Sequence, residues 1–108
     1  MSERAPFRVE VHTERGRVVV APCGDVDVET VAAVRRILED LRLSGWAHVV
    51  LDTRRISFID SSGLRMLLEE HRAGAAPERS FAIVPGSRAV ARALAVSGLS
   101  GYFTCAER

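Results

Sequence analysis

The sequence predicts a single α/β domain, in which helices pack on a mixed β-sheet that begins with a hairpin. Three observations support this fold class. Along the chain the apolar residues change from a spacing of two to a spacing of three or four, which marks a change from strand to helix. Helical segments alternate with short apolar runs that suit buried strands, which favours a sheet with helical cover. The length of 108 residues suits one domain with one core, so we expect residues 1–108 to form it.

The first half of the chain predicts a hairpin and then a helix. Apolar and polar residues alternate over 7–12, as in a half-buried strand, and a turn at 14–17 leads into the apolar run 18–21. From Glu29 onward the apolar residues recur at helical spacing. Gly45 is expected to end this helix, because glycine readily adopts the backbone conformation found after a helix.

A strand and a second helix are predicted next. The apolar run 48–52 suits a central strand, and 53–59 is expected to continue in extended or turn form. The second helix is expected to end at Gly74 and to turn one apolar stripe toward the core. This stripe consists of Leu64, Leu67, Leu68 and His71. Met66 lies off the stripe, so a position facing a partner stays open as an alternative for it.

The last third of the chain predicts one more strand and helix. Residues 81–84 form an apolar run that suits a buried strand. Ser87 is expected to cap the third helix and Gly98 to end it. Residues 102–105 are expected to form a last short strand or tail. The apolar stripe of the third helix consists of Val90, Ala93 and Leu94.

Composition excludes several classes of partner and compartment. The 15 basic and 14 acidic residues give a net charge of +1, and the arginines are scattered, which argues against nucleic acid or an anionic membrane as a partner. No apolar run is long enough to span a membrane, and residues 1–8 lack the apolar core of a signal peptide. We therefore expect a cytoplasmic protein. Cys23 and Cys105 are expected to be free thiols that act as small apolar residues, with a bridge between them as the alternative.

Most kinds of catalytic or cofactor site lack support in the sequence. His12, His48 and His71 fall in separate elements without metal-ligand spacing, so no metal is expected. The chain contains no lysine and no glycine-rich phosphate loop, which argues against nucleotide chemistry. The serines at 61 and 62 do not lie in a G-x-S-x-G elbow, so a serine hydrolase is not expected. An enzyme with Ser61 as nucleophile stays open, because the sequence does not show which base lies near it.

The most informative segment is 58–64, with the sequence F-I-D-S-S-G-L. Asp60, Ser61 and Ser62 stand where an amphipathic helix begins, and residues of these types commonly cap helices. A hydroxyl at this place also lies at the surface, beside unpaired backbone N–H groups and the positive end of the helix dipole. The fold would therefore tolerate a phosphate there. Two interpretations follow, a helix cap and a site whose charge can change.

The runs 49–52 and 56–64, the second ending in D-S-S-G-L, resemble the signature of STAS domains, and in particular of bacterial anti-sigma factor antagonists. The likeness covers nearly the whole chain, since G-D-V-D at 24–27 is similar to the family's early turn and 89–99 to its last helix and closing turn. The resemblance implies an α/β domain without catalysis of its own. It would bind an anti-sigma factor with serine kinase activity and release a sigma factor. The kinase would bring ATP and magnesium, and a phosphatase would act on the phosphorylated form, so this chain itself is expected to need no cofactor.

The resemblance also assigns roles to individual residues. Ser61 matches the serine that the kinase phosphorylates, and this phosphorylation would switch the protein off. Ser62 matches the second hydroxyl position, and Asp27 matches an acidic residue at the partner surface. Asp60 and Gly63 belong to the same motif, so we expect both of them, with Asp27 and Ser62, to contribute to partner binding.

Two departures from the family pattern are visible. Asp25 stands where relatives often have Glu, which could alter the choice of kinase, and the loop 74–79 lacks the usual paired glycines. Asp25 and Asp27 also have a structural interpretation, as turn residues that bond local backbone N–H groups, and we favour it for Asp25. For Asp27 we favour docking to an Arg of the kinase, so Asp27→Ala is expected to weaken the complex and leave thermal stability nearly unchanged.

One other function within the same family stays open. A STAS domain can serve as a docking subunit of a transporter complex, in which the same helix face would act as a structural contact. The intact D-S-S-G-L string argues against this alternative, because a docking surface alone does not need a modifiable serine.

Overall fold

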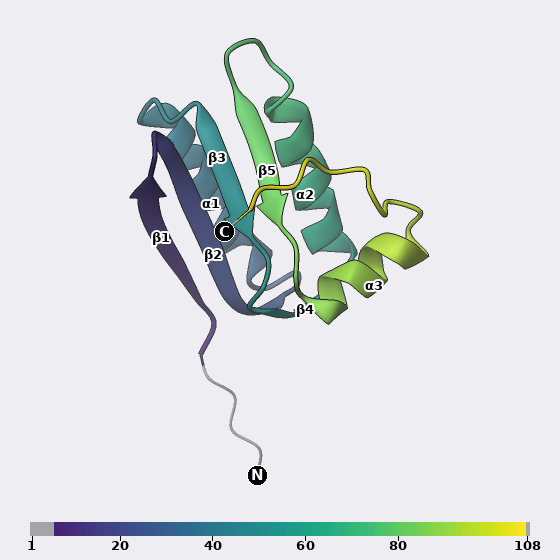
Figure 1. Ribbon diagram of the computed structural model, residues 1–108. Coiled ribbons are helices and arrows are strands. Elements are labelled where there is room, and N and C mark those ends of the chain that lie inside the picture. Colours follow the sequence, from purple (N-terminus) through teal and green to yellow (C-terminus); the bar gives the residue numbers. More distant parts are fainter. Residues whose placement is uncertain (1–5, 108) are drawn as a thin grey trace.

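The computed structural model describes residues 6–107, in which five strands form one mixed sheet with helices packed against it (Figure 1). This confirms the predicted fold class. In chain order the elements are β1 (Arg8–Glu14), β2 (Arg17–Val26), α1 (Val31–Leu43), β3 (His48–Asp52), β4 (Ile56–Ile59), α2 (Ser61–Ala73), β5 (Ser80–Val84) and α3 (Arg88–Val96).

The strand order across the sheet is β1-β2-β3-β5. The predicted hairpin is confirmed, because β1 pairs antiparallel with β2, with Glu14 opposite Arg17 next to the turn. β2, β3 and β5 run parallel to one another. β4 pairs in parallel with the last residues of β2, beyond the part of β2 that pairs with β3. The segment 53–59, expected in extended or turn form, therefore contains a short strand.

β2 is longer than the sequence predicts. A turn was expected at 24–27, but residues 24–26 continue β2 and pair with β4. The register shifts between Gly24 and Asp25, and Gly24 has a φ of +120°, which favours glycine. β2 pairs with β3 as far as Val20 and with β4 from Gly24 onward, so the chain after β2 is brought beside the chain after β4.

The main core lies between the sheet and the helices α1 and α2, which are behind the sheet in Figure 1. Alternate residues of β2 face opposite sides, so Val18 and Val20 belong to this core and Val19 does not. On the other side the C-terminal segment crosses the sheet, where Ala106 packs against Val19 and its neighbours (Figure 1). The expected last strand is a single parallel bridge between Ile83 and Cys105.

The inner face of α2 is centred differently from the prediction, although Leu67 is fully buried as predicted and Leu64 and Leu68 pack against the edge of the core. Leu64, Leu68 and His71 are only half-buried, whereas the buried residues are Gly63, Met66, Leu67 and Glu70. Met66 is fully buried, so the alternative that it faces a partner is wrong. The sequence pattern failed here because Glu70 is charged and Gly63 has no side chain, yet both lie on the inner face.

Burial of Glu70 is possible because α1 supplies a cation. The Arg42 guanidinium donates two hydrogen bonds to the Glu70 carboxylate, with N–O distances of 2.8 and 3.0 Å. Burial raises the pKa of Glu70, and the charge and hydrogen bonds of Arg42 act in the opposite direction. This ion pair joins α1 to α2 at the edge of the core.

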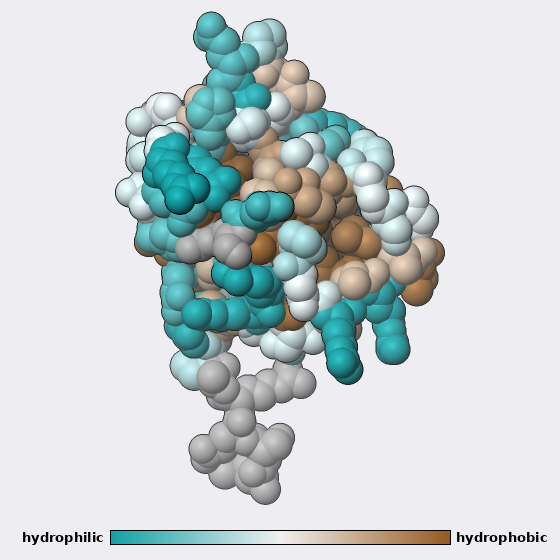
Figure 2. Space-filling model, viewed as in Figure 1, coloured by the Kyte–Doolittle hydropathy of each residue, from teal (hydrophilic) through white to brown (hydrophobic). Residues whose placement is uncertain are grey.

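The helices α1 and α3 begin and end close to the positions that the sequence predicts. α1 is followed by Gly45, which has a φ of +95°, and the Ser87 hydroxyl caps α3 by accepting the Val90 N–H at 3.2 Å. In the predicted stripe of α3 only Val90 is buried, while Ala93 and Leu94 are half-buried. Because these side chains are only half-buried, apolar surface is visible over α3 and the adjoining C-terminal segment (Figure 2).

The remaining sequence predictions concern cysteines and targeting. Cys23 and Cys105 are both free thiols, as predicted, but Cys105 is exposed and does not act as a buried apolar residue. The prediction that the first residues are not a signal peptide falls mostly on residues 1–5, which lie outside the described part of the chain. Among the described helices, none has the length and apolar character needed to cross a membrane.

Candidate functional site

The predicted site lies where β4 ends and α2 begins. Asp60, directly after β4, has an extended backbone and caps α2. Its Oδ1 accepts hydrogen bonds from the Ser62 N–H at 2.9 Å, the Gly63 N–H at 3.2 Å and the Ser62 hydroxyl at 2.5 Å. The helix-cap interpretation of this segment is thus confirmed, and a cap of this kind is worth about 1 kcal/mol.

The two adjacent serines have different environments. Ser61 is the first residue of α2, is exposed, and has no hydrogen bond from its hydroxyl to any of residues 6–107. Ser62 is half-buried, and its hydroxyl donates to Asp60. A phosphate on Ser62 would break this hydrogen bond and place a dianion on the carboxylate. The geometry therefore favours Ser61 as the residue that accepts a modifying group.

Asp60 keeps a negative charge beside Ser61. The hydrogen bond from the Ser62 hydroxyl lowers the pKa of Asp60, burial acts in the opposite direction, and backbone N–H groups lower it further. These N–H groups belong to Gly63, Ser62 and Val28. Because the ordinary aspartate pKa is already well below neutrality, the Asp60 carboxylate is ionised at pH 7.

The segment between β2 and α1 lies next to the start of α2. The Asp60 N–H donates to the Val26 carbonyl at 3.2 Å, and the Val28 N–H points to the Asp60 carboxylate. Asp27 stands between these two residues of the segment. Two stretches that are more than thirty residues apart in the sequence thus bring the Asp27 and Asp60 backbones close together.

Asp27 also fixes the turn that leads into α1, a role that was not predicted for it. Its Oδ1 accepts the Glu29 N–H at 2.9 Å and the Thr30 N–H at 3.1 Å. In return the Thr30 hydroxyl accepts the Asp27 N–H at 3.0 Å and donates to the Asp25 carbonyl at 2.6 Å. This reciprocal arrangement is a capping box. The expectation that Asp27 takes no part in folding is therefore wrong, and Thr30 is a supporting residue that the sequence analysis missed.

We expect Asp27→Ala to lower the free energy of unfolding by about 0.5 to 2 kcal/mol, because it removes a helix cap. Asp27→Asn keeps an oxygen acceptor in the same place and should retain most of this stability while removing the charge. Chemical denaturation of both variants measures the capping effect. Equal stability of the wild type and Asp27→Ala would contradict it.

Gly63, which the sequence predicts as a partner-binding residue, is buried and acts as a packing residue. It is buried, and a Cβ added to it would lie 2.5 Å from Ile59 Cγ1 and 3.0 Å from Val26 Cγ1. Such distances are too short for carbon atoms. The missing side chain lets the first turn of α2 lie directly against the ends of β2 and β4, which holds Ser61 at the surface.

A cavity of about 910 Å³ opens beside this site at the end of the sheet. The sequence analysis did not predict it, because three separate segments supply its walls. It is lined by Phe7, Arg8, Cys23, Gly24, Asp25, Asp27, Thr30, Arg55, Ser57 and Phe58. The cavity therefore adjoins both β4 and the acidic segment after β2.

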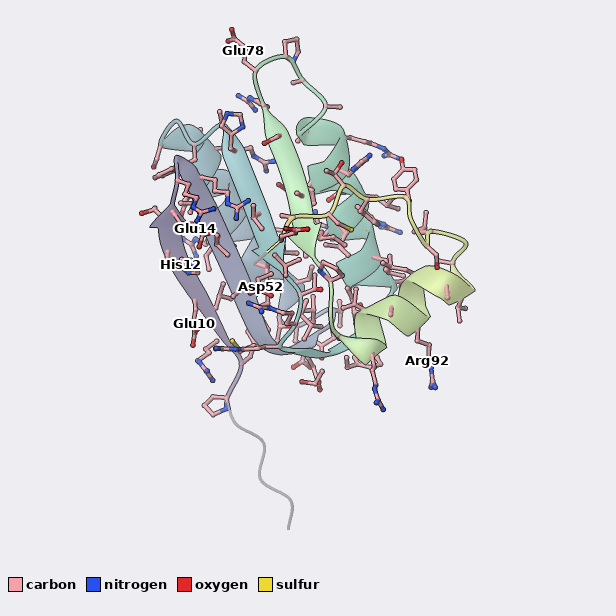
Figure 3. The ribbon with its side chains drawn as sticks, viewed as in Figure 1. Glu10, His12, Glu14, Asp52, Glu78 and Arg92 are labelled. Carbon is pink, nitrogen blue, oxygen red and sulfur yellow. The ribbon has the colours of Figure 1, made fainter. Side chains whose placement is uncertain are left out.

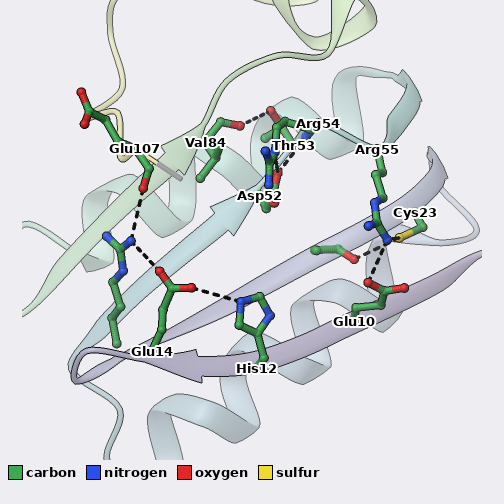
Figure 4. A network of polar contacts seen from close by, with 12 residues as sticks. Glu10, His12, Glu14, Cys23, Asp52, Thr53, Arg54, Arg55, Val84 and Glu107 are labelled. Atoms are coloured by element: carbon green, nitrogen blue, oxygen red, sulfur yellow. Dashed lines mark hydrogen bonds and ion pairs between the residues drawn. The ribbon is translucent and has the colours of Figure 1, made fainter.

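Glu10 forms ion pairs with both arginines of this cavity. Its carboxylate accepts hydrogen bonds from Arg8 at 3.0 Å and from Arg55 at 2.8 Å, and Figure 4 shows Arg55 between Glu10 and Cys23. A hydrogen bond from Arg8 and the charge of Arg55 lower the pKa of Glu10. Glu10 is one of the polar residues along β1, together with His12 and Glu14 (Figure 3).

Metal-ligating side chains are scattered over the described part of the chain. Within residues 6–107 there is no group of three or more His, Cys, Asp and Glu side chains that could hold a metal ion. The histidines have other partners, since His12 lies 3.3 Å from Glu14, His48 lies 2.8 Å from the Ser80 hydroxyl, and His71 packs against Tyr102. In the described structure no base is hydrogen-bonded to Ser61.

Fold and site together define a class of protein: a small α/β domain that carries an exposed serine at a helix N-terminus, with carboxylates beside it. The chain belongs to the STAS domain family, whose sequence model matches residues 8–108. No curated protein sequence gives a significant match to this chain.

Solved structures with the same fold include anti-sigma factor antagonists. One from Mycobacterium paratuberculosis has a TM-score of 0.83 at 22% identity, over 100% of this chain and 92% of that one. The unphosphorylated form of the anti-sigma factor antagonist SpoIIAA has a TM-score of 0.74 at 25% identity, over 95% of this chain and 90% of that one. The phosphorylated form of SpoIIAA from Bacillus has a TM-score of 0.69 at 24% identity, over 95% and 93% of the two chains.

Proposed function

We propose that this protein is an anti-sigma factor antagonist. It binds an anti-sigma factor that has serine kinase activity, so that a sigma factor is released, and phosphorylation of Ser61 switches it off. The observation that carries this proposal is the exposed, unbonded Ser61 hydroxyl at the start of α2, next to the ionised Asp60. A phosphatase that acts on the phosphorylated form resets the switch, and the protein acts in the cytoplasm, where transcription takes place.

The proposed partner surface surrounds Ser61. It comprises Asp27, Asp60 and Ser62. Asp60 and Ser62 flank Ser61 in the sequence, and Asp27 follows Val26, whose carbonyl accepts a hydrogen bond from the Asp60 N–H. Asp27 has a second carboxylate oxygen beyond the one that caps α1, and an Arg of the kinase suits it. Gly63 lies beneath this surface and supports it through packing only.

The physical basis of the switch is that phosphate affects the domain and the complex differently. A phosphate on Ser61 adds about −1.5 to −2 charges. The dipole of α2 stabilises negative charge at its N-terminus by about 0.3 to 1 kcal/mol, so the domain itself stays folded. In support, SpoIIAA has been solved with this fold in both its unphosphorylated and its phosphorylated form. A partner surface shaped for a neutral hydroxyl has to accept a dianion beside carboxylates, which costs several kcal/mol.

Phosphate transfer to the purified protein tests this proposal. The protein is incubated with ATP, magnesium and each serine-kinase anti-sigma factor encoded by its source organism, and the sites are mapped by mass spectrometry. We expect one phosphate on Ser61, no phosphate on Ser61→Ala, and normal transfer to Ser62→Ala. Phosphate found only on Ser62 contradicts the choice of residue, and no transfer from any of these kinases contradicts the proposed function.

A further inference from the structure

We propose that the cavity beside Ser61 is a docking site for an apolar side chain of the kinase, with Phe58 as its main contact. This inference rests on the proposed function, because it names how that partner is held next to the serine. The chemistry of the occupant is specific: an apolar side chain with a Lys or Arg close to it in the kinase.

The apolar half follows from the exposure of Phe58. β4 turns Ile56 and Ile59 into the core, but Phe58 is 49% exposed and lines the cavity three residues before Ser61. Val28, whose N–H bonds to the Asp60 carboxylate, is 73% exposed. A solvent-exposed aromatic ring in the rim of a cavity is typical of the residues that dominate protein–protein binding energy.

The shape of the cavity depends on a second aromatic ring. Phe7, just before β1, also lines the cavity, and its Cδ1 would lie 3.3 Å from a Cβ added to Gly24. Because Gly24 has no side chain, the Phe7 ring can lie over the irregular part of β2. Phe7, just before β1, and Phe58, in β4, thus both stand on the cavity wall.

The cationic half follows from the balance of charge around the cavity. Arg8 and Arg55 share the single carboxylate of Glu10, so this end of the cavity keeps one uncompensated positive charge. By contrast, the carboxylates of Asp27 and Asp60 accept only N–H and O–H donors, and neither has a salt bridge with a cation in the described part of the chain. The side of the cavity next to Ser61 is therefore negative, and a Lys or Arg of the kinase complements it.

An affinity series with a matched control tests the inference. The kinase is the one that phosphorylates Ser61 in the experiment above, and its Kd and the kcat/KM of phosphate transfer are measured for each variant. We expect Phe58→Ala to weaken binding about 10- to 100-fold, as for an aromatic residue at the centre of an interface. The loss should appear in kcat/KM, with little change in kcat at saturating protein.

The control is Leu43→Ala. Leu43 is 79% exposed and ends α1, whose 13 residues separate it from the acidic segment by about 20 Å. Its removal should change the Kd less than twofold. Equal effects of Phe58→Ala and Leu43→Ala overturn the docking site.

Further variants keep the test decisive if Phe58→Ala loses stability. Phe58→Leu keeps an apolar side chain and should retain most of the affinity. Phe58→Gln has a polar side chain and should lose most of the affinity, although the two variants are expected to have the same unfolding midpoint. If the wild type is phosphorylated and the Gln variant binds as tightly as the Leu variant, the docking site is wrong while the proposed function stands. If no kinase phosphorylates the wild type, the proposed function fails, and the inference fails with it.

Discussion

Leu67→Ala is expected to lower the free energy of unfolding by about 2 to 5 kcal/mol, the range for truncating a buried leucine. Leu67 is 0% exposed and belongs to the same core cluster as Val49 and Leu51 of β3. Its removal leaves a cavity between α2 and the sheet, because the fixed backbone of the sheet prevents collapse around the missing atoms. Denaturant titration with fluorescence or circular dichroism measures the loss.

The exposed Leu43 supplies the reference for this experiment. Leu43→Ala removes the same atoms from the surface of α1 and should change the stability by less than about 0.5 kcal/mol. A loss below half a kcal/mol for Leu67→Ala would mean that α2 turns another face to the core. Such a result would also undermine the position of Ser61, because the same helix rotation places Ser61 at the surface.

The second large effect concerns binding. Ser61→Ala should bind the kinase like the wild type but accept no phosphate, since a methyl group keeps the surface neutral. Ser61→Asp should stay folded and bind weakly, because it places a carboxylate next to Asp60 and close to the acidic segment of Asp27. A penalty of about 3 kcal/mol corresponds to a loss of more than a hundredfold in affinity. A single Asp charge produces a smaller loss than the phosphate itself.

The fold was predictable from the sequence where local pattern and tertiary structure agree. The valine run of β2 and the strand at 48–52 each have an apolar pattern that matches their burial. The alternation before the first turn predicted the strand β1, but Val11 of that pattern is 44% exposed. The inner face of α2 was not predictable, because the Glu70 carboxylate is buried only through its pairing with Arg42 of α1. A one-dimensional pattern carries no information about that distant partner.

The site was predictable in its residues and less so in their roles. The D-S-S-G-L string located Ser61, and the cap at Asp60 follows from residue type alone. The roles of Asp27 and Gly63 depend on neighbours that come from β2, β4 and α1, so the sequence misassigned part of each. The cavity beside Phe58 had no sequence signal, because its wall combines residues from β1, β2 and β4.

The most direct test of the switch is a calorimetric titration of the kinase with the unphosphorylated protein and with the protein phosphorylated on Ser61. Both forms are first checked for the same unfolding midpoint, so that any difference in affinity comes from the surface. We predict binding of the unphosphorylated form and, for the phosphorylated form, a Kd at least about a hundredfold higher. Equal affinity of the two forms would contradict the mechanism.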